Sequence, residues 1–103
     1  MIRFRAALEE DGRSLGFWGL NEMENIWELE FFYISQEYIG KGYGRKLWNS
    51  LVAECKKRGI SEIQLVTSPQ SAQFYEKMGA KVIGRTESLI VKGKMIPRLE
   101  FCC

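Results

Sequence analysis

Residues 34–51 read ISQEYIGKGYGRKLWNSL, and this stretch decides the fold because a strand-like run breaks into glycines and then becomes helical. The bulky, β-favouring run from Phe31 to Ile34 is typical of a buried strand. Gly40, Gly42 and Gly44 then predict a turn. Apolar residues follow at spacings of three and four, which indicates a helix with one buried face: Leu47, Trp48, Leu51, Val52 and Cys55.

The predicted unit is therefore a strand, a glycine loop and a helix. Glycine has no Cβ, so the loop can adopt positive φ and bring its N–H groups close to a ligand. The first turn of the helix adds unpaired N–H donors and a partial positive charge. We expect an anion site here, most simply for phosphate, with a plain tight turn as the alternative. The loop is not a P-loop, because Gly44 is followed by Arg45, Lys46 and Leu47 instead of Lys and Ser or Thr.

Length and composition limit the choice of protein class. The 103 residues predict one domain, residues 1–103. Hydrophobic residues at 46% and charged residues at 27% are ordinary values, no apolar run approaches about 18 residues, and the start, IRFRAALEED, does not resemble a signal peptide. A net charge of +2, with acidic and basic residues interspersed, argues against a nucleic-acid partner. We therefore expect a cytoplasmic protein that binds neither nucleic acid nor membrane.

The three cysteines do not form a disulfide framework, since their number is odd and Cys102 and Cys103 are adjacent. The chain has no histidine and no second cysteine pair at ligand spacing, so we expect no zinc site, no other metal, and free thiols. Without histidine, a general base must be a carboxylate, a tyrosine, a lysine, a cysteine or water.

The rest of the chain alternates between strand-like and helix-like patterns. A hairpin with a turn at residues 9–12 and a further turn at 21–25 lead into a strand that carries Glu28 and Glu30 on one face. The first helix extends to about Arg58 and stops at Gly59, and the second begins at Ser68-Pro69 and ends at Gly79. The remaining expected strands are 14–20, 27–34, 63–66, 80–84 and 95–101. This order predicts an α+β, or mixed α/β, fold with two helices and one right-handed parallel βαβ crossover in a mostly antiparallel sheet.

Two stretches on these elements together resemble a known family. Residues 37–47, EYIGKGYGRKL, resemble motif A of the GNAT superfamily of acetyl-CoA-dependent N-acetyltransferases, and residues 72–80, AQFYEKMGA, resemble its motif B. Both occur in the family's order and separation, and the resemblance covers about two thirds of the chain. The chain departs from the family at Ile39, where motif A has Gln or Arg, and at Pro69, where an asparagine often precedes motif B.

The resemblance implies the acyl-CoA N-acyltransferase fold and acetyl-CoA as co-substrate. Backbone N–H groups from Lys41 to Arg45 would hold the pyrophosphate, and main-chain groups from Phe32 to Ile34 would pair with the pantetheine arm. That strand would splay from its parallel neighbour to admit the cofactor. The cofactor-binding residues implied are Phe32, Tyr33, Ile34, Ile39, Gly40, Lys41, Gly42, Tyr43, Gly44, Arg45, Lys46, Ser71, Phe74 and Lys77.

The resemblance also implies direct transfer of acetyl from the thioester to a primary amine. Glu28 is the first candidate for the base that deprotonates the amine, with Glu30 or a water relay as alternatives, and Tyr75 is the candidate acid for the leaving thiolate. The structural alternatives are solvated carboxylates for the glutamates and, for Tyr75, a core aromatic ring whose hydroxyl bonds to the backbone.

Members of this family usually begin with a strand and one or two helices that form a wall on the acceptor side, whereas this sequence begins at what resembles their second strand. We therefore expect a short form that is completed by a second copy in a homodimer. An alternative explanation of the short form is a large acceptor that needs no enclosing wall. The alternative function is a non-catalytic module on the same fold that binds acyl-CoA or another protein. A nucleotide-phosphate binder is a more remote alternative. The sequence leaves the acceptor amine open.

Overall fold

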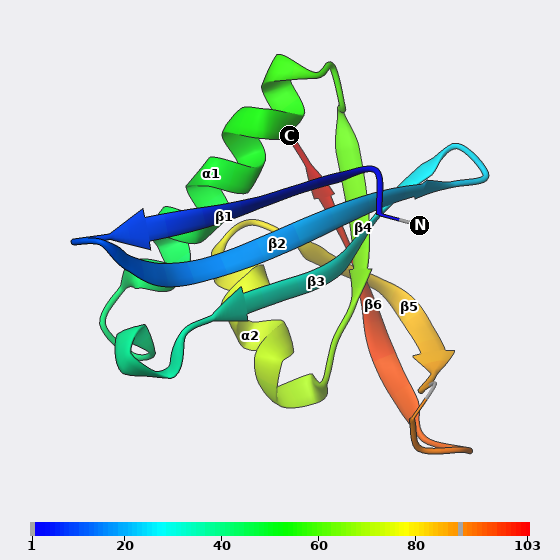
Figure 1. The fold of residues 1–103 in the computed structure, drawn as a ribbon. Helices are drawn as coiled ribbons and strands as arrows, with labels where there is room; N and C mark the ends of the chain where they lie inside the picture. Colours follow the sequence, from blue (N-terminus) through cyan, green and yellow to red (C-terminus); the bar gives the residue numbers. More distant parts are fainter. Residues whose placement is uncertain (1, 89) are drawn as a thin grey trace.

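The computed structural model describes residues 2–88 and 90–103. Its strands form one sheet in the order β1-β2-β3-β4-β6-β5 (Figure 1). β3 and β4 run parallel, and the other neighbouring pairs are antiparallel. The predicted fold class is confirmed. The elements in chain order are β1 (Phe4–Glu10), β2 (Arg13–Met23), β3 (Ile26–Ile34), a short 3-10 turn (Gln36–Tyr38), α1 (Tyr43–Lys57), β4 (Glu62–Val66), α2 (Pro69–Lys77), β5 (Lys81–Glu87) and β6 (Met95–Cys102).

Two strands are longer than the sequence predicted. β2 continues to Met23, which pairs with Ile26, so the expected turn at 21–25 shrinks to Glu24 and Asn25, both at positive φ. β5 continues past Gly84 to Glu87, because its ladder with β6 extends to the Glu87–Met95 pair. Cross-strand pairing supplies hydrogen bonds that the sequence pattern of a single strand does not reveal.

The helices bury their apolar faces against the same side of the sheet and against each other. Gly44 of α1 lies under the ring of Phe74 of α2, and Trp48 meets Tyr75 edge to face at 5.8 Å between centroids. The predicted face of α1 is buried except for Val52, which is partly buried. The core between helices and sheet contains Trp18, Leu20, Leu29, Leu47, Trp48, Leu51, Cys55, Ile60, Ile63, Leu65, Ala72, Tyr75, Ala80 and Leu99.

Helix boundaries follow the predicted signals. Gly42 caps the N-terminus of α1 at φ 82°, and Gly59 follows its C-terminus at φ 74°. Ser68 caps α2, where its hydroxyl accepts a 3.3 Å hydrogen bond from the N–H of Ser71, and Pro69 occupies the first turn.

A β-bulge at Glu30 changes which side chains of β3 face the core. Leu29 pairs with Leu20 and Phe31 pairs with Gly19, so Glu30 has no partner on β2. After the bulge, Phe32 and Ile34 pack toward the helices, whereas Tyr33 is 49% exposed on the other face. The prediction that residues 31–34 form a uniformly buried run is therefore wrong. The sequence placed Glu28 and Glu30 on one face because side chains two residues apart share a face in a regular strand. The bulge interrupts this alternation, so the expectation no longer follows.

The two parallel strands separate soon after they meet. In the described part of the chain their register contains only the Glu28–Gln64 pair, and the ribbons then diverge toward their carboxyl ends (Figure 1). The edge of β3 beyond Leu29 therefore has main-chain groups that no neighbouring strand pairs. This splay opens the sheet at its centre, beside α2 (Figure 1).

All three cysteines are free, as expected: Cys55 is buried, Cys102 is exposed and Cys103 is partly buried. In the part of the chain that the structure describes, neither helix has the length and apolar character needed to cross a membrane.

Candidate active site

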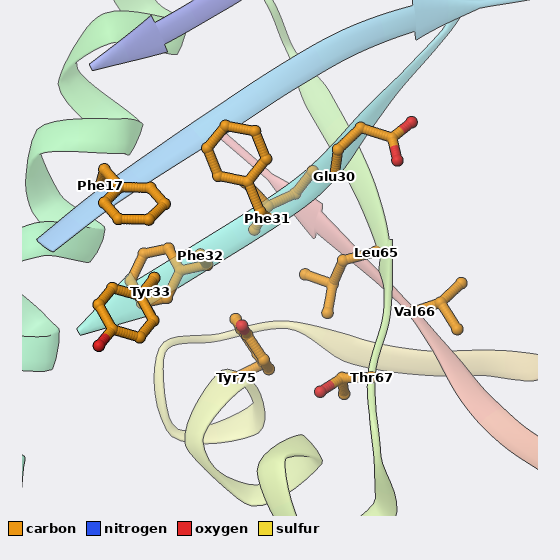
Figure 2. Close-up of a pocket in the computed structure, with 10 residues that line it drawn as sticks. Phe17, Glu30, Phe31, Phe32, Tyr33, Leu65, Val66, Thr67 and Tyr75 are labelled. Carbon is orange, nitrogen blue, oxygen red and sulfur yellow. The ribbon is translucent and has the colours of Figure 1, made fainter. Parts of the chain in front are cut away.

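A cavity of about 440 Å³ lies where β3 and β4 diverge (Figure 2). Its lining comes from both faces of the sheet, since Phe32 and Tyr75 belong to the helix side and Phe17 to the uncovered side. The cavity therefore passes through the sheet between the two strands. The lining residues are Phe17, Leu29, Glu30, Phe31, Phe32, Tyr33, Leu65, Val66, Thr67 and Tyr75.

Tyr75 rises from α2 with its hydroxyl directed toward the gap between β3 and β4 (Figure 2). Its ring is held edge to face by Phe32 at 5.9 Å and by Trp48 at 5.8 Å between centroids. Burial raises the pKa of Tyr75 to about 12, so the phenol keeps its proton at neutral pH and can only donate it. Among the described residues, Tyr75 is not among those whose polar side-chain atoms are buried without a partner, so its hydroxyl is open to the cavity.

The structure separates the two candidate glutamates. Glu28 forms an ion pair with Arg98, at 3.0 Å between Oε1 and Nη1, and its side chain is 17% exposed. Glu30 lines the cavity and is exposed, and in the described residues its carboxylate forms no ion pair. Geometry thus favours Glu30 over Glu28 as the group that a reacting amine would meet.

The glycine loop borders a second cavity of about 460 Å³ at the N-terminus of α1. Gly40 and Gly42 have φ of 79° and 82°, in the region that other residues adopt only with strain. Among the residues that the structure describes, no side chain caps the start of α1, and the first turn of α1 contains no acidic residue, so its N–H groups are available to a ligand. The lining residues are Ile34, Tyr38, Ile39, Gly40, Gly42, Gly44, Arg45, Phe74, Lys77 and Met78.

The cations near this loop are not equivalent. Arg45 and Lys77 line the cavity. Lys46 instead binds both carboxylate oxygens of Glu10 at 2.6 and 2.8 Å, and this hydrogen bond is the main cause of its raised pKa. The loop therefore combines helix N–H donors with two available cations, which suits a di-anionic phosphate group.

Most predicted cofactor residues border one of the two cavities, but four do not. Lys41 is exposed, Tyr43 packs on Tyr38 at 4.9 Å between centroids, Lys46 is paired with Glu10, and Ser71 contributes its N–H to the cap of α2. Lys41 and Tyr43 are expected to bind the pyrophosphate through their main-chain N–H groups. The positions of their side chains therefore do not test this expectation.

Sequence reasoning missed several lining residues. Tyr38 and Met78 border the loop cavity, and Thr67 follows β4 at the edge where parallel strands end. The position of Thr67 was readable from the predicted βαβ unit, because ligands bind at the carboxyl ends of parallel strands. The bulge that brings Phe31 into the lining had no such signal.

Comparison with known proteins supports the same fold. A model of the acetyltransferase (GNAT) family matches residues 3–80. An aminoglycoside 6'-N-acetyltransferase, solved in complex with coenzyme A, superposes with a TM-score of 0.82 at 20% identity over 95% of this chain and 71% of that chain. No curated protein sequence matches the chain significantly.

Two further solved structures share this fold. The ribosomal-protein-S18-alanine N-acetyltransferase from Escherichia coli superposes with a TM-score of 0.79 at 17% identity, over 96% of this chain and 68% of that chain. The aminoglycoside 6'-N-acetyltransferase from Enterococcus faecium superposes with a TM-score of 0.79 at 21% identity, over 95% of this chain and 71% of that chain. At these identities the likeness shows the fold.

Proposed function

Because the chain belongs to the acetyltransferase (GNAT) family, we propose that it transfers an acetyl group from acetyl-CoA to a primary amine by direct attack in a ternary complex. The observation that carries this proposal is the cavity between β3 and β4, which brings an unpaired strand edge and the Tyr75 hydroxyl to one opening that Glu30 borders. A purely structural splay would not require these groups to converge.

The proposed binding mode for acetyl-CoA uses the loop and the strand edge. N–H groups from Gly40 to Arg45 hold the pyrophosphate, with charge from the side chains of Arg45 and Lys77. The pantetheine arm pairs with the main chain from Phe32 to Ile34 in the manner of an added strand. Ile39 lines the loop cavity without adding charge there, which is compatible with this mode because the loop donors are backbone groups.

The proposed chemistry assigns one proton transfer to each side of the cavity. Glu30, directly or through water, removes the proton from the ammonium so that the amine nitrogen attacks the acetyl carbonyl. A backbone N–H of β3 stabilises the oxyanion. The C–S bond then breaks, and Tyr75 donates its proton to the departing thiolate. The nitrogen then loses its second proton, through water, to the Tyr75 phenolate, and Glu30 releases the first proton to solvent. The products are an amide and free coenzyme A, and both side chains return to their starting protonation states.

Binding and turnover are tested separately. Thermal shift with acetyl-CoA measures binding, and release of free thiol across a panel of amines measures turnover. Tyr75→Phe is expected to lower kcat about 100-fold with little change in the Kd for acetyl-CoA, because it removes only the acidic proton. A rise in Tm with acetyl-CoA but no thiol release from any amine would instead identify a non-catalytic acyl-CoA-binding module. An unchanged Tm with acetyl-CoA would refute both the acetyltransferase and the acyl-CoA-binding module.

The expected homodimer remains a proposal, supported by the edge strand β5. β5 pairs only with β6 in the described residues, and Val82 and Ile83 are each 47% exposed. Pairing of two β5 edges would satisfy their main-chain groups and cover these side chains. Light scattering at micromolar concentration tests this, and Ile83→Glu is expected to convert a dimer to monomers. A monomeric parent chain would refute the dimer.

A further inference from the structure

Three aromatic rings form a cluster on the face of the sheet that the helices leave uncovered. Phe17 stacks on Tyr33 at 5.0 Å between centroids and meets Phe31 edge to face at 5.6 Å. Phe17 is 41% and Tyr33 49% exposed, and all three rings line the cavity between β3 and β4 (Figure 2). We call Phe17, Phe31 and Tyr33 the aromatic platform.

Backbone features of two strands position this platform. The bulge at Glu30 turns Phe31 to the uncovered face. There its ring lies over Gly19, where an added Cβ would come within 2.3 Å of the ring. Glycine at position 19 is therefore required for the observed position of Phe31, so the open rings are a specified feature and not a by-product of a loosely packed edge.

The charged part of the cavity lining is negative. Of the described residues that line the cavity, Glu30 alone is charged, and no arginine or lysine is among them. Ring faces carry negative potential and attract ammonium groups, and a carboxylate does so more strongly. An acceptor with its own carboxylate or phosphate would find no cation here, and a polyhydroxylated acceptor would leave its hydroxyls against the rings without hydrogen-bond partners.

We propose that the aromatic platform and Glu30 select, as the acetyl acceptor, a primary amine carried on an aromatic or extended alkyl group. The rings cover the apolar body of the acceptor, Glu30 at the border of the cavity attracts its ammonium group, and Tyr75 lines the same cavity. This inference rests on the proposed acetyl transfer, and it names a narrower acceptor than the family assignment does.

A panel of acceptors tests the selection. Thiol release from acetyl-CoA is compared for 2-phenylethylamine, hexylamine, ethanolamine, glycine and kanamycin. We expect kcat/KM for the first two to exceed that for ethanolamine by about 30-fold, the factor expected from burying one ring or alkyl chain. Turnover with no preference for the apolar amines would overturn this inference and leave the proposed function standing. No turnover with any amine would overturn both.

Variants test whether the platform causes the preference. Phe17→Ser is expected to lower kcat/KM for 2-phenylethylamine about 10-fold while ethanolamine is little affected. Ile26→Ser is the matched control, because Ile26 is 42% exposed on the same sheet but does not line the cavity. Phe17→Leu, which keeps an apolar side chain, provides a second measurement if the serine variant folds poorly. Because leucine lacks the ring, we expect this variant to lower kcat/KM for 2-phenylethylamine relative to hexylamine. An unchanged preference in a folded Phe17→Ser variant, an unchanged ratio of these two amines in Phe17→Leu, or a lost preference in the Ile26 control would each contradict the proposal.

Discussion

The guanidinium of Arg98 on β6 donates a 3.0 Å hydrogen bond to the carboxylate of Glu28 on β3, across the intervening strand β4. The same nitrogen donates to the side-chain oxygen of Gln64 on β4 at 3.1 Å. This contact joins three strands at the one register position where β3 and β4 still pair. The contact therefore holds β3 and β4 together at the point from which they diverge. It also pairs the Glu28 carboxylate, whereas Glu30 borders the cavity.

This geometry predicts different outcomes for the two glutamates. Glu30→Gln is expected to lower kcat/KM at pH 7 by about 100-fold, because the amine loses its proton acceptor. Glu28→Gln is expected to lower the free energy of unfolding by about 1–2 kcal/mol with a much smaller effect on kcat, because it weakens a half-buried charged hydrogen bond. Thiol release and urea unfolding give the two readouts. The opposite pattern would make Glu28 the base.

The contact between Gly44 and Phe74 predicts that substitutions at these two positions have non-additive effects on stability. An added Cβ at Gly44 would lie 2.7 Å from the ring of Phe74, so Gly44→Ala displaces the ring that borders the loop cavity. We expect weaker acetyl-CoA binding and no gain in stability. In a Phe74→Ala background, Gly44→Ala should raise the free energy of unfolding by about 1 kcal/mol, because alanine has a higher helix propensity than glycine. Urea unfolding of the four proteins measures the coupling, and additive effects would contradict it.

The sequence predicted the parts of the site that depend on local backbone chemistry. Gly42 and Gly59 indicated both ends of α1, and Ser68 with Pro69 indicated the start of α2, because caps are encoded within a few residues. The βαβ order then gave the parallel pair, and the resemblance to the family singled out Tyr75. These features need no knowledge of which strand lies next to which.

The parts that were not predicted depend on cross-strand register. The bulge at Glu30 becomes visible only when Gly19 is paired with Phe31, and it changes the face of every later residue in β3. The Glu28–Arg98 pair joins residues 70 positions apart in sequence, on strands that are not neighbours. The resemblance ranked Glu28 ahead of Glu30, and it contained no sign that Glu28 pairs with Arg98 while Glu30 borders the cavity.

The basic residues around the loop predict a graded effect on cofactor binding. Arg45→Ala and Lys77→Ala are each expected to raise the Kd for coenzyme A several-fold, and more at low salt, because they remove a cation that lines the cavity. Lys46→Ala is the matched control, since its ammonium is bound to Glu10. Titration calorimetry at two salt concentrations measures the effect. A larger loss from Lys46→Ala would place the phosphates on the other side of α1.

Two buried groups make stability depend on alkaline pH. Burial raises the pKa of Tyr75 from 10.0 to about 12 and the pKa of Cys55 from 9.0 to about 12. The unfolded chain therefore loses these protons at lower pH than the folded chain does. Their contribution to stability is complete below about pH 9 and is lost as the pH rises toward 12, because unfolding then releases protons.

We expect the free energy of unfolding to fall across pH 9–12, with a limiting slope of about 1.4 kcal/mol per pH unit for each group while its unfolded form is ionised and its folded form is not. Cys55→Ala and Tyr75→Phe should each flatten this slope, even though both lower stability at pH 7 by removing buried atoms. Cys102→Ala removes an exposed thiol and is the matched control. Urea unfolding at intervals from pH 7 to 11 measures the slopes. Parallel profiles for the parent chain and the Cys55 and Tyr75 variants would show that neither group ionises on unfolding.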